Sequence, residues 1–521
     1  MRWEDQTFTY QTRFRVTLEQ DQVLGAYGDL YSRVEHKLFK ELMVGGSVGK
    51  LKSVMMAEFG LTARQYNAIA IGLRGKISSI KERRSGLIKE AKIRIARAKK
   101  LVTKLYKAEV GSEKLHQKKR RLATLVARLK TLKADHKAGK VRLCFGSKKL
   151  FRAQFYLEAN GYQSHEAWRQ EWQEARSSQF YVIGSKDESG GCVGCVATLQ
   201  EDGSLNLRLR LPNILGGKHL ILEGLRFAYG QEQILESLKA GRAISYRFKR
   251  DVKGWRVLVS TGMAARPQVS RRQSGSIGVD INSDHLAVSE TDRFGNLVKV
   301  KRVKCVTAGK SSNQTRATVG EAAKAVVAMA LKQGKPIAIE KLDFSKKKAE
   351  AEGSDKRANK RLSSFAYSQV STTIHSAAFR NEVGVLEVNP AFSSVIGAVN
   401  HAHKQGISIH GGAALVIARR GAGLAERPAG PVAKVPTGQD DWVTLVLPVR
   451  NRTKHVWSDW SAIRTKLRAA RRVQDRSRRV LAPRSPDRLA LSANRSLRLQ
   501  EPHVNHLQNG SVGVIDEDLI P

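Results

Sequence analysis

Two apolar segments of this chain each end in a carboxylate, and this pattern limits the folds that the chain can adopt. Ser-Ile-Gly-Val-Asp ends at Asp280, and Pro-Ile-Ala-Ile-Glu ends at Glu340. Both segments have the composition of buried strands. Because Asp and Glu are rarely buried without a partner cation, packing alone explains these two acids poorly. We therefore expect two strand ends that present Asp280 and Glu340 to a divalent metal.

The residues around these acids predict a mixed sheet with helices on its faces. Three strands in a meander are followed by alternating helices and strands, which is the order of an α/β layer structure. The expected elements are strand 277–281, strand 285–290, strand 297–303, helix about 317–332, strand 336–340, helix about 357–380, strand 384–388 and a helix from about 411.

A long helical hairpin is expected ahead of this sheet. Apolar residues at alternating three- and four-residue spacing predict two amphipathic helices, over about 88–105 and 122–132, with Gly111 between them. Their other faces are basic with few acids interspersed, which favours nucleic-acid binding over a merely solvated face. The basic residues of this surface include Arg83, Arg84, Arg94, Arg97, Lys118, Lys119, Arg120 and Arg121.

Short strand-like runs divided by Gly, Asn and Asp predict a β-rich domain between about residues 140 and 265. Residues 7–16 alternate bulky and polar side chains and predict one more half-buried strand. The run 205–211 would present Arg208 and Arg210 on one face, either to phosphates or to solvent. Residues 266–276 have the composition of a linker.

The chain is strongly basic. Its 92 Lys and Arg against 47 Asp and Glu give a net charge of +45, which indicates a polyanionic partner. A ribosomal or chromatin-like binder would share this charge but not the paired strand-end acids. The Arg-rich stretch from Arg464 to Arg498, with Trp457 and Trp460 just ahead of it, has weak periodicity and is expected to be largely disordered without nucleic acid.

Other features narrow the class of protein. The length of 521 residues suggests roughly three domains. No uninterrupted apolar stretch is long enough to span a membrane, and no signal peptide pattern opens the chain, so we expect a cytoplasmic protein of a prokaryotic cell, close to its nucleoid. The pair Cys192 and Cys195 is half of a zinc site at most, and we favour a tight turn with free thiols.

The acid-containing segments resemble a known family in their order and spacing. The segments are Gly-Val-Asp-Ile-Asn-Ser-Asp-His-Leu-Ala-Val at 278–288, Ile-Ala-Ile-Glu-Lys-Leu-Asp-Phe at 337–344 and Val-Leu-Glu-Val-Asn-Pro-Ala-Phe-Ser-Ser at 385–394. They are similar to the RuvC-like nuclease domain of the TnpB (OrfB) proteins of insertion sequences, which are relatives of type V CRISPR effectors. The resemblance implies an RNase H-like site in which Asp280 and Glu340 are the first and second metal ligands.

The third ligand departs from the family pattern. Most relatives carry a zinc ribbon after the Asn-Pro motif and then an acid at a helix start. Here no cysteine follows Cys305, so the ribbon is absent and no zinc is expected, and Ile-His-Gly-Gly places His410 where the acid would be. An imidazole can bind a divalent metal, although Mg²⁺ prefers oxygen and Mn²⁺ tolerates nitrogen better. His410 could instead be a general base, a phosphate contact or only a helix-start residue. Glu387, or the pair Asp440 and Asp441, could supply the missing acid.

The resemblance implies an α+β multidomain fold. The expected parts are the first strand of a β-rich wedge-like domain in 1–25, a helical recognition region in 26–138, the rest of the wedge-like domain in 139–268, the RuvC-like nuclease domain in 269–425 and a basic, partly disordered region in 426–521.

The implied function is RNA-guided DNA cleavage with Mg²⁺ or Mn²⁺ as cofactor, and guide RNA and target DNA as partners. A guided binder that does not cut, or a guide-independent accessory protein of a transposon, are the alternatives. The sequence favours no particular oligomeric state.

Overall fold

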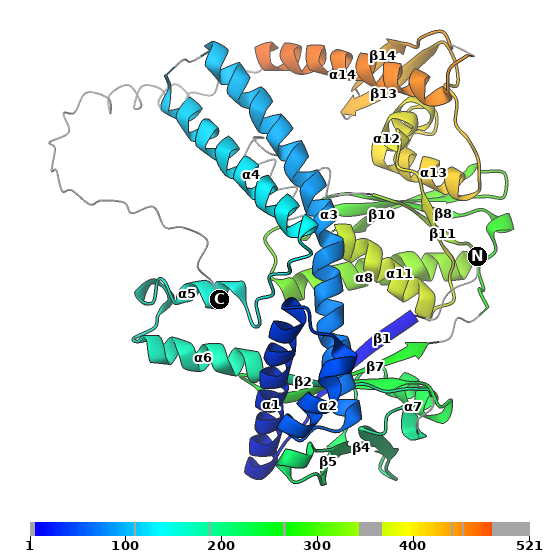
Figure 1. Cartoon of the computed structure of the whole chain (residues 1–521). Coiled ribbons are helices and arrows are strands. Elements are labelled where there is room, and N and C mark those ends of the chain that lie inside the picture. Colours follow the sequence, from blue (N-terminus) through cyan, green and yellow to red (C-terminus); the bar gives the residue numbers. More distant parts are fainter. Residues whose placement is uncertain are drawn as a thin grey trace.

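The structure, a computed structural model, describes residues 6–108, 111–186, 189–263, 267–342, 367–438, 441–450 and 453–481. Asp440, the start of the expected linker, residues 357–366 of an expected helix and the tail beyond 481 lie outside these ranges. The described residues form several sheets together with long helices (Figure 1), which confirms the expected mixed α+β architecture of more than one domain.

A four-stranded antiparallel sheet joins the start of the chain to its middle. Its order is β1 (Gln6–Arg13), β7 (Gly254–Met263), β6 (Ile244–Asp251) and β2 (Gln179–Val182). β1 pairs with β7 along its whole length, from Gln6 opposite Met263 to Arg13 opposite Arg256. The strand expected over 7–16 therefore belongs to the same sheet as strands found about midway along the chain.

A second, three-stranded antiparallel sheet lies beside the first in the common core. It consists of β3 (Cys195–Leu199), β4 (Leu205–Arg210) and β5 (His219–Leu225), and helix α7 (Gln231–Lys239) follows it. The segment expected to be β-rich also contains two helices, α5 (Lys148–Ala153) and α6 (His165–Ser177), which the sequence did not predict. Ser164 caps α6, and the indole of Trp168 donates to the carbonyl of Leu150 at 2.7 Å, so these helices hold each other in place.

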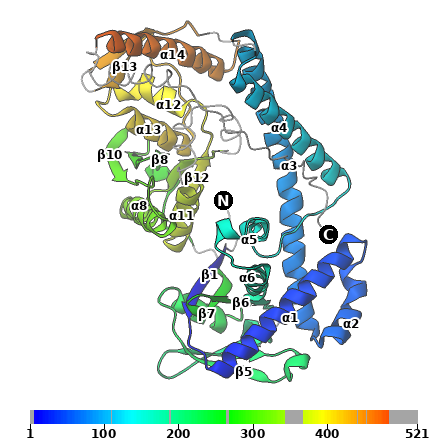
Figure 2. The same cartoon turned by 90° about the vertical axis from the view of Figure 1, so that its left-hand side faces the viewer.

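The helical region consists of α1 (Leu18–Met43), α2 (Val48–Phe59), α3 (Ala63–Ala108) and α4 (Glu113–Lys137). The expected antiparallel hairpin is present, with Gly111 at a φ of +83° in the turn, a conformation that costs glycine little. Ile95 and Ala98 of α3 pack against Leu125 of α4. The hairpin extends as a long arm from the end of the molecule that holds β1 and β7 toward the end that holds α14 (Figures 1 and 2).

The sheet that carries the strand-end acids has the order β10-β9-β8-β11-β12. β8 (Ile277–Ile281), β11 (Ile337–Glu340) and β12 (Val385–Val388) are parallel, whereas β9 (His285–Thr291) and β10 (Leu297–Lys304) form an antiparallel meander with β8. β8 is therefore the central strand, and Asp280 lies near its end.

Helices cover both faces of this sheet. Ile277 and Val279 point toward α8 (Ser312–Gln333) and α11 (Tyr367–Arg380), with which they share one core. Gly278 faces the other side, where a Cβ atom would lie 2.0 Å from the carbonyl oxygen of Ala414 in α13 (Ile409–Gly421). Because side chains alternate along a strand, Asp280 shares the face of Gly278 and lies under α13.

A folded unit follows α13 and includes residues 464–481, for which the sequence predicted disorder; the rest of that Arg-rich stretch, 482–498, lies outside the described residues. It contains β13 (Val432–Gly438), β14 (Asp441–Val446) and α14 (Val456–Leu481), packed against α12 (Ser393–Ile396) and the π-helical turn η5 (Gly397–Ala402). The fully buried Trp460 lies in this core. Both views place the end of α14 near the tip of the α3–α4 hairpin (Figures 1 and 2).

Within the described part of the chain, none of the helices is long and apolar enough to cross a bilayer.

Candidate functional site

Asp280 is held at the centre of the site by its own strand and turn. Its side chain is 12% exposed, and Oδ2 accepts a hydrogen bond of 3.0 Å from Nδ2 of Asn282. Asn282 begins the turn that leads into β9. A buried carboxylate with one amide donor still needs compensation for its charge.

His410 provides that compensation from α13. Ser408 caps this helix by accepting a hydrogen bond from the Gly411 amide, and the cap fixes the first turn, which carries His410. Nδ1 of His410 lies 3.2 Å from Oδ2 of Asp280, although the two residues are 130 positions apart. The structure thus brings together two of the three residues that the sequence assigned to the site.

The contact with Asp280 favours the charged form of His410. The hydrogen bond to the carboxylate raises the pKa of the imidazole above its ordinary value, and this outweighs partial burial, which acts in the opposite direction. An imidazolium that donates through Nδ1 to Asp280 has no lone pair at that atom for a metal.

A second histidine lies next to His410 and was not singled out from the sequence. The rings of His285 and His410 are 5.3 Å apart at 81°, and His285 is buried. Nδ1 of His285 lies 2.8 Å from Oδ1 of Asp284, whose Oδ2 accepts a hydrogen bond from Arg302 at 2.6 Å. The bond to His285 is the main cause that lowers the pKa of the Asp284 carboxyl. The adjacent pair Asp284-His285, which follows Asp280 closely in the sequence, was the signal that could have pointed to His285.

Glu340 lies on the neighbouring parallel strand, on the same face as Asp280. Ile339 pairs with Val279, so Glu340 and Asp280, the next residues along the two parallel strands, lie at the same level of the sheet. Ala338, which is on the same face as Glu340, packs against Ile417 of α13. One carboxylate oxygen of Glu340 accepts a hydrogen bond from the hydroxyl of the buried Ser393 in α12.

Two further groups near Glu340 were missed by the sequence reading. The Tyr367 hydroxyl donates to the backbone carbonyl of Glu340, and burial followed by the charge of Glu340 raises the pKa of this phenol. Arg420 of α13 donates to the carbonyls of Asn389 at 2.5 Å and Ala391 at 2.7 Å. Burial lowers the pKa of Arg420, and the charge of Glu340 acts against that shift. No sequence motif marks either residue, because each reaches Glu340 from a distant element.

The donor chemistry fits a divalent metal only in part. Asp280 and Glu340 supply the oxygen atoms that Mg²⁺ prefers, on adjacent strands and one face. Within the described ranges, however, no three His, Cys, Asp or Glu side chains are arranged to hold a metal ion. His410 is directed to Asp280 by its hydrogen bond, so in this arrangement it does not complete the set.

The alternative acids lie elsewhere. Glu387 of β12 pairs with Lys341 at 3.5 Å and with His375 of α11 at 3.4 Å, which places it on the face opposite α13. Asp441 belongs to β14 and accepts a hydrogen bond from Gln474 at 2.8 Å. Neither side chain reaches Asp280 in this structure.

The basic residues of the α3–α4 hairpin differ in orientation. Arg84 is buried and donates to the carbonyls of Asp135 at 2.7 Å and Lys140 at 2.5 Å, so its guanidinium binds the end of α4 rather than facing outward. Arg94 pairs with Glu90 on its own helix, and Lys119 lies 5.5 Å from the ring of Tyr106. Lys118 is half-buried, and the remaining members are exposed: Arg83, Arg97, Arg120 and Arg121.

Arg208 and Arg210 lie on β4 as expected, with Arg208 exposed and Arg210 half-buried. Burial, and then the charges of Arg208 and Arg210, lower the pKa of His219 on the adjoining strand. The thiols of Cys192 and Cys195 are fully buried and do not form a disulfide, and that of Cys192 donates to the carbonyl of Ile183 at 3.5 Å. Burial raises the pKa of Cys195 well above its ordinary value.

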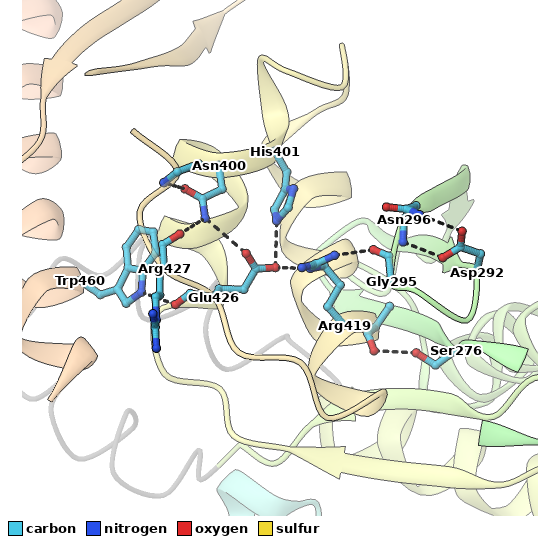
Figure 3. A network of polar contacts seen from close by, with 12 residues as sticks. Ser276, Asp292, Gly295, Asn296, Asn400, His401, Arg419, Glu426, Arg427 and Trp460 are labelled. Carbon is cyan, nitrogen blue, oxygen red and sulfur yellow. Dashed lines mark hydrogen bonds and ion pairs between the residues drawn. The ribbon is translucent and has the colours of Figure 1, made fainter. Parts of the chain in front are cut away.

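A buried polar network anchors the other end of α13 (Figure 3). The carboxylate of Glu426 accepts hydrogen bonds from Arg419 at 2.5 Å and from Asn400 at 3.3 Å, and it lies 3.0 Å from Nε2 of His401. Burial opposes ionisation of Glu426, but the interactions with His401 and Arg419 outweigh it and hold the pKa of the carboxyl below its ordinary value. The backbone carbonyl of Glu426 accepts from the indole of Trp460 at 3.1 Å. The network therefore joins the helix that carries His410 to η5 and α14.

Comparisons with known proteins give limited matches. A family model described as AMIN domain matches residues 245–340, a stretch that runs from β6 to the end of β11 and takes in parts of two sheets. A comparison with curated proteins finds no match.

Among solved structures the chain is similar to Cas12f and RuvC, at low TM-scores. The Cas12f1–sgRNA–target DNA complex is 10% identical with a TM-score of 0.33, over 80% of this chain and 99% of that chain. T. thermophilus RuvC in complex with a Holliday junction substrate is 14% identical with a TM-score of 0.20, over 27% and 88%. A CRISPR-Cas12f ternary complex is 11% identical with a TM-score of 0.20, over 79% and 98%.

Proposed function

We propose that the chain is an RNA-guided DNA endonuclease of TnpB type, encoded by a mobile element and acting in the cytoplasm of a prokaryotic cell. The observation that carries the proposal is the placement of Asp280 and Glu340. Asp280, the next-to-last residue of the central strand, and Glu340, the last residue of its parallel neighbour, lie on one face and under one helix. A meander of three strands followed by two parallel strands, with the acids on the first and fourth, is the arrangement expected of an RNase H-like nuclease domain over 269–425.

Each residue of the site has a distinct part in this proposal. Asp280 and Glu340 would hold Mg²⁺ or Mn²⁺, which activates water and stabilises the leaving oxygen in phosphodiester hydrolysis. Ser393 orients Glu340 through its hydroxyl, and Asn282 orients Asp280 through its amide. His410 would hold a proton between Nδ1 and the carboxylate of Asp280, and its role as a third ligand stays a prediction.

The other regions would hold the nucleic acids. The exposed basic side chains of the helical recognition region over 26–138 would contact guide RNA and target DNA through their phosphates, as would Arg208 of the wedge-like domain over 139–268. Base pairing with the guide would supply most of the sequence specificity. The first strand of the wedge-like domain, within 1–25, would tie the start of the chain to this assembly.

The test is to purify the chain with its bound RNA, sequence that RNA, and assay a matching DNA with Mg²⁺ or Mn²⁺. Asp280→Ala and Glu340→Ala should each reduce cleavage to the level of a metal-free reaction while leaving guided binding intact. Glu387→Ala is the matched control, because it removes a carboxylate from the adjacent strand on the opposite face and should leave cleavage unchanged. Cleavage that survives Asp280→Ala would refute the assignment, and the absence of a defined RNA would refute the guided function.

A second candidate is a guided DNA-binding protein that does not cut. It is favoured by the contact between Asp280 and His410, because an imidazolium there compensates the carboxylate without a metal. His410→Asp separates the two: in a nuclease it should retain or raise Mg²⁺-supported cleavage, whereas a binder should stay inactive. Guided binding without cleavage in the unmodified protein would establish this second candidate.

A further inference from the structure

An exposed tryptophan lies on the outer face of the C-terminal hairpin. Trp442 of β14 is 50% exposed, although it pairs with Pro436 across the hairpin. The residues that alternate with Trp442 along the strand lie on the other face: Val443 packs against the core of this unit, and Leu445 is buried within it. The alternation of side chains along a strand therefore directs the indole away from the core.

Two basic groups flank the indole. Nζ of Lys434, on β13, lies 5.7 Å from the centre of the Trp442 ring. The ring of His403, just after η5, lies 6.0 Å from it at an angle of 76°. The three side chains come from separate elements and converge at one place, which defines the Trp442 patch: Trp442, Lys434 and His403.

The Trp442 patch adjoins a cavity of about 170 Å³. Two of its members, His403 and Lys434, line this cavity, and Lys404 adds another positive charge. None of the described residues that line it is acidic. The nearby carboxylate of Glu426 is buried and engaged by Arg419 and His401, so it does not offset the positive charge of the cavity.

Asn400 forms part of the cavity wall but is not a recognition group. Its Nδ2 donates to the carbonyl of Arg427 at 2.7 Å, and its Oδ1 accepts from the amide of Ala429 at 3.3 Å. These bonds fix the shape of the cavity wall and occupy the polar atoms of the Asn400 side chain. A ligand would therefore be bound by the indole of Trp442 and by the lysines.

We propose that the Trp442 patch binds an unpaired nucleotide of a single-stranded nucleic acid. A base would stack on the exposed indole, and its phosphates would lie beside Lys434 and Lys404. An aromatic platform flanked by cations is the arrangement that holds single strands, because every base has a π face and every linkage a negative charge. The inference deepens the proposed function by naming a single-strand contact, but it requires neither cleavage nor a guide.

Charge favours a nucleic acid over a protein partner for this surface. Val432 and Val446 are exposed on the same face of the hairpin, and apolar groups alone would equally suit a protein. The lysines around the indole match a polyanion instead, and the described residues that line the cavity include no acid.

A photocrosslinking experiment tests the site directly. The full chain is mixed with a single-stranded DNA oligonucleotide that carries 5-iodouracil, irradiated, digested with trypsin and examined by mass spectrometry. The crosslink should fall in the peptide from Val435 to Arg450, which contains one tryptophan, Trp442. Trp442→Ala should reduce this crosslink by at least about five-fold, the size of one lost stacking contact, and Trp442→Phe should retain much of it.

The controls distinguish stacking on Trp442 from contacts at another tryptophan and from attraction by charge alone. Trp457→Ala removes another exposed tryptophan of the same unit, outside the patch, and should leave the crosslink intact. An abasic oligonucleotide of equal length should bind the unmodified protein and Trp442→Ala equally, which isolates stacking from charge. Crosslinks that map only elsewhere, or that persist in Trp442→Ala, would overturn the inference. The readout does not depend on cleavage, so an inactive nuclease would still give the expected crosslink.

Discussion

At the scale of single residues, the contact between His410 and Asp280 determines the charge of the site. Carboxylate and imidazolium stabilise each other only while both are charged. The ordinary pKa of the imidazole is 6.5, and the contact raises it. As long as Asp280 is ionised, the stabilisation is therefore complete below pH 6.5, and it is lost as the pH rises through the higher pKa of His410 in the folded state.

Asp280→Asn should lower the pKa of His410, because the anionic partner is lost while partial burial remains. The histidine resonances followed by NMR against pH would measure this, with His410→Gln used to assign the signal. The destabilisation caused by Asp280→Asn should be largest in mildly acidic solution and smaller in alkaline solution. An unchanged pKa of His410 would show that the contact is not formed in solution.

At the scale of elements, the close approach of α13 to β8 positions His410. Gly278 makes this approach possible, since a Cβ atom there would lie 2.0 Å from the Ala414 carbonyl oxygen and 2.4 Å from the Ala418 amide nitrogen. Gly397 and Gly412 permit a similar contact between η5 and α13, where a Cβ on Gly397 would lie 2.3 Å from the amide nitrogen of Ala413. Helix α13 therefore cannot be moved independently of the sheet and η5.

Gly278→Ala should displace α13 and destabilise its packing by about 1–3 kcal/mol, the usual cost of overpacking. Hydrogen exchange of the α13 amides should accelerate, and the pKa of His410 should fall toward its ordinary value. Gly320→Ala is the matched control, because nothing lies within 4 Å of the added Cβ in α8. That change should stabilise the helix by about 0.5–1 kcal/mol. Equal exchange in both variants would contradict the steric role of Gly278.

At the scale of the whole molecule, the chain carries a net charge of +45. Some cations are used within the fold, as Arg84 is, and these cannot contact phosphates. Others, such as Lys119 and Arg120 on the outer surface of α4, are exposed. Binding of a polyanion should depend on this second group and weaken as salt increases.

The triple change of Lys118, Lys119 and Arg120 to Gln should reduce the salt dependence of nucleic-acid binding. Each lost phosphate contact lowers the slope of log K against log salt concentration by about 0.7–0.9, so the slope should fall by about two if most of these residues bind phosphates. Fluorescence anisotropy at several salt concentrations would measure it. The matched control changes three exposed lysines on other parts of the chain to Gln: Lys239, Lys253 and Lys332. This control should leave the slope nearly unchanged.

The sequence by itself determined those features that neighbouring residues encode. The strands that carry Asp280 and Glu340 and the α3–α4 hairpin follow from apolar periods of two and of three to four residues, which depend only on local geometry. The candidate metal-binding acids were therefore predictable as strand-end residues.

Only the tertiary structure decided which side chains meet. It directs Glu387 away from the Asp280 face, turns Arg84 inward and brings His285 beside His410. It also shows a folded C-terminal unit, whose core includes residues of η5 and α13. Within α14 the residues that pack in this core, Val456, Trp460, Ile463 and Leu467, recur every three to four positions, a helical period that the sequence prediction overlooked. The physical reason is that strand pairing, face and helix docking are contacts between residues far apart in the chain, and no local pattern specifies them.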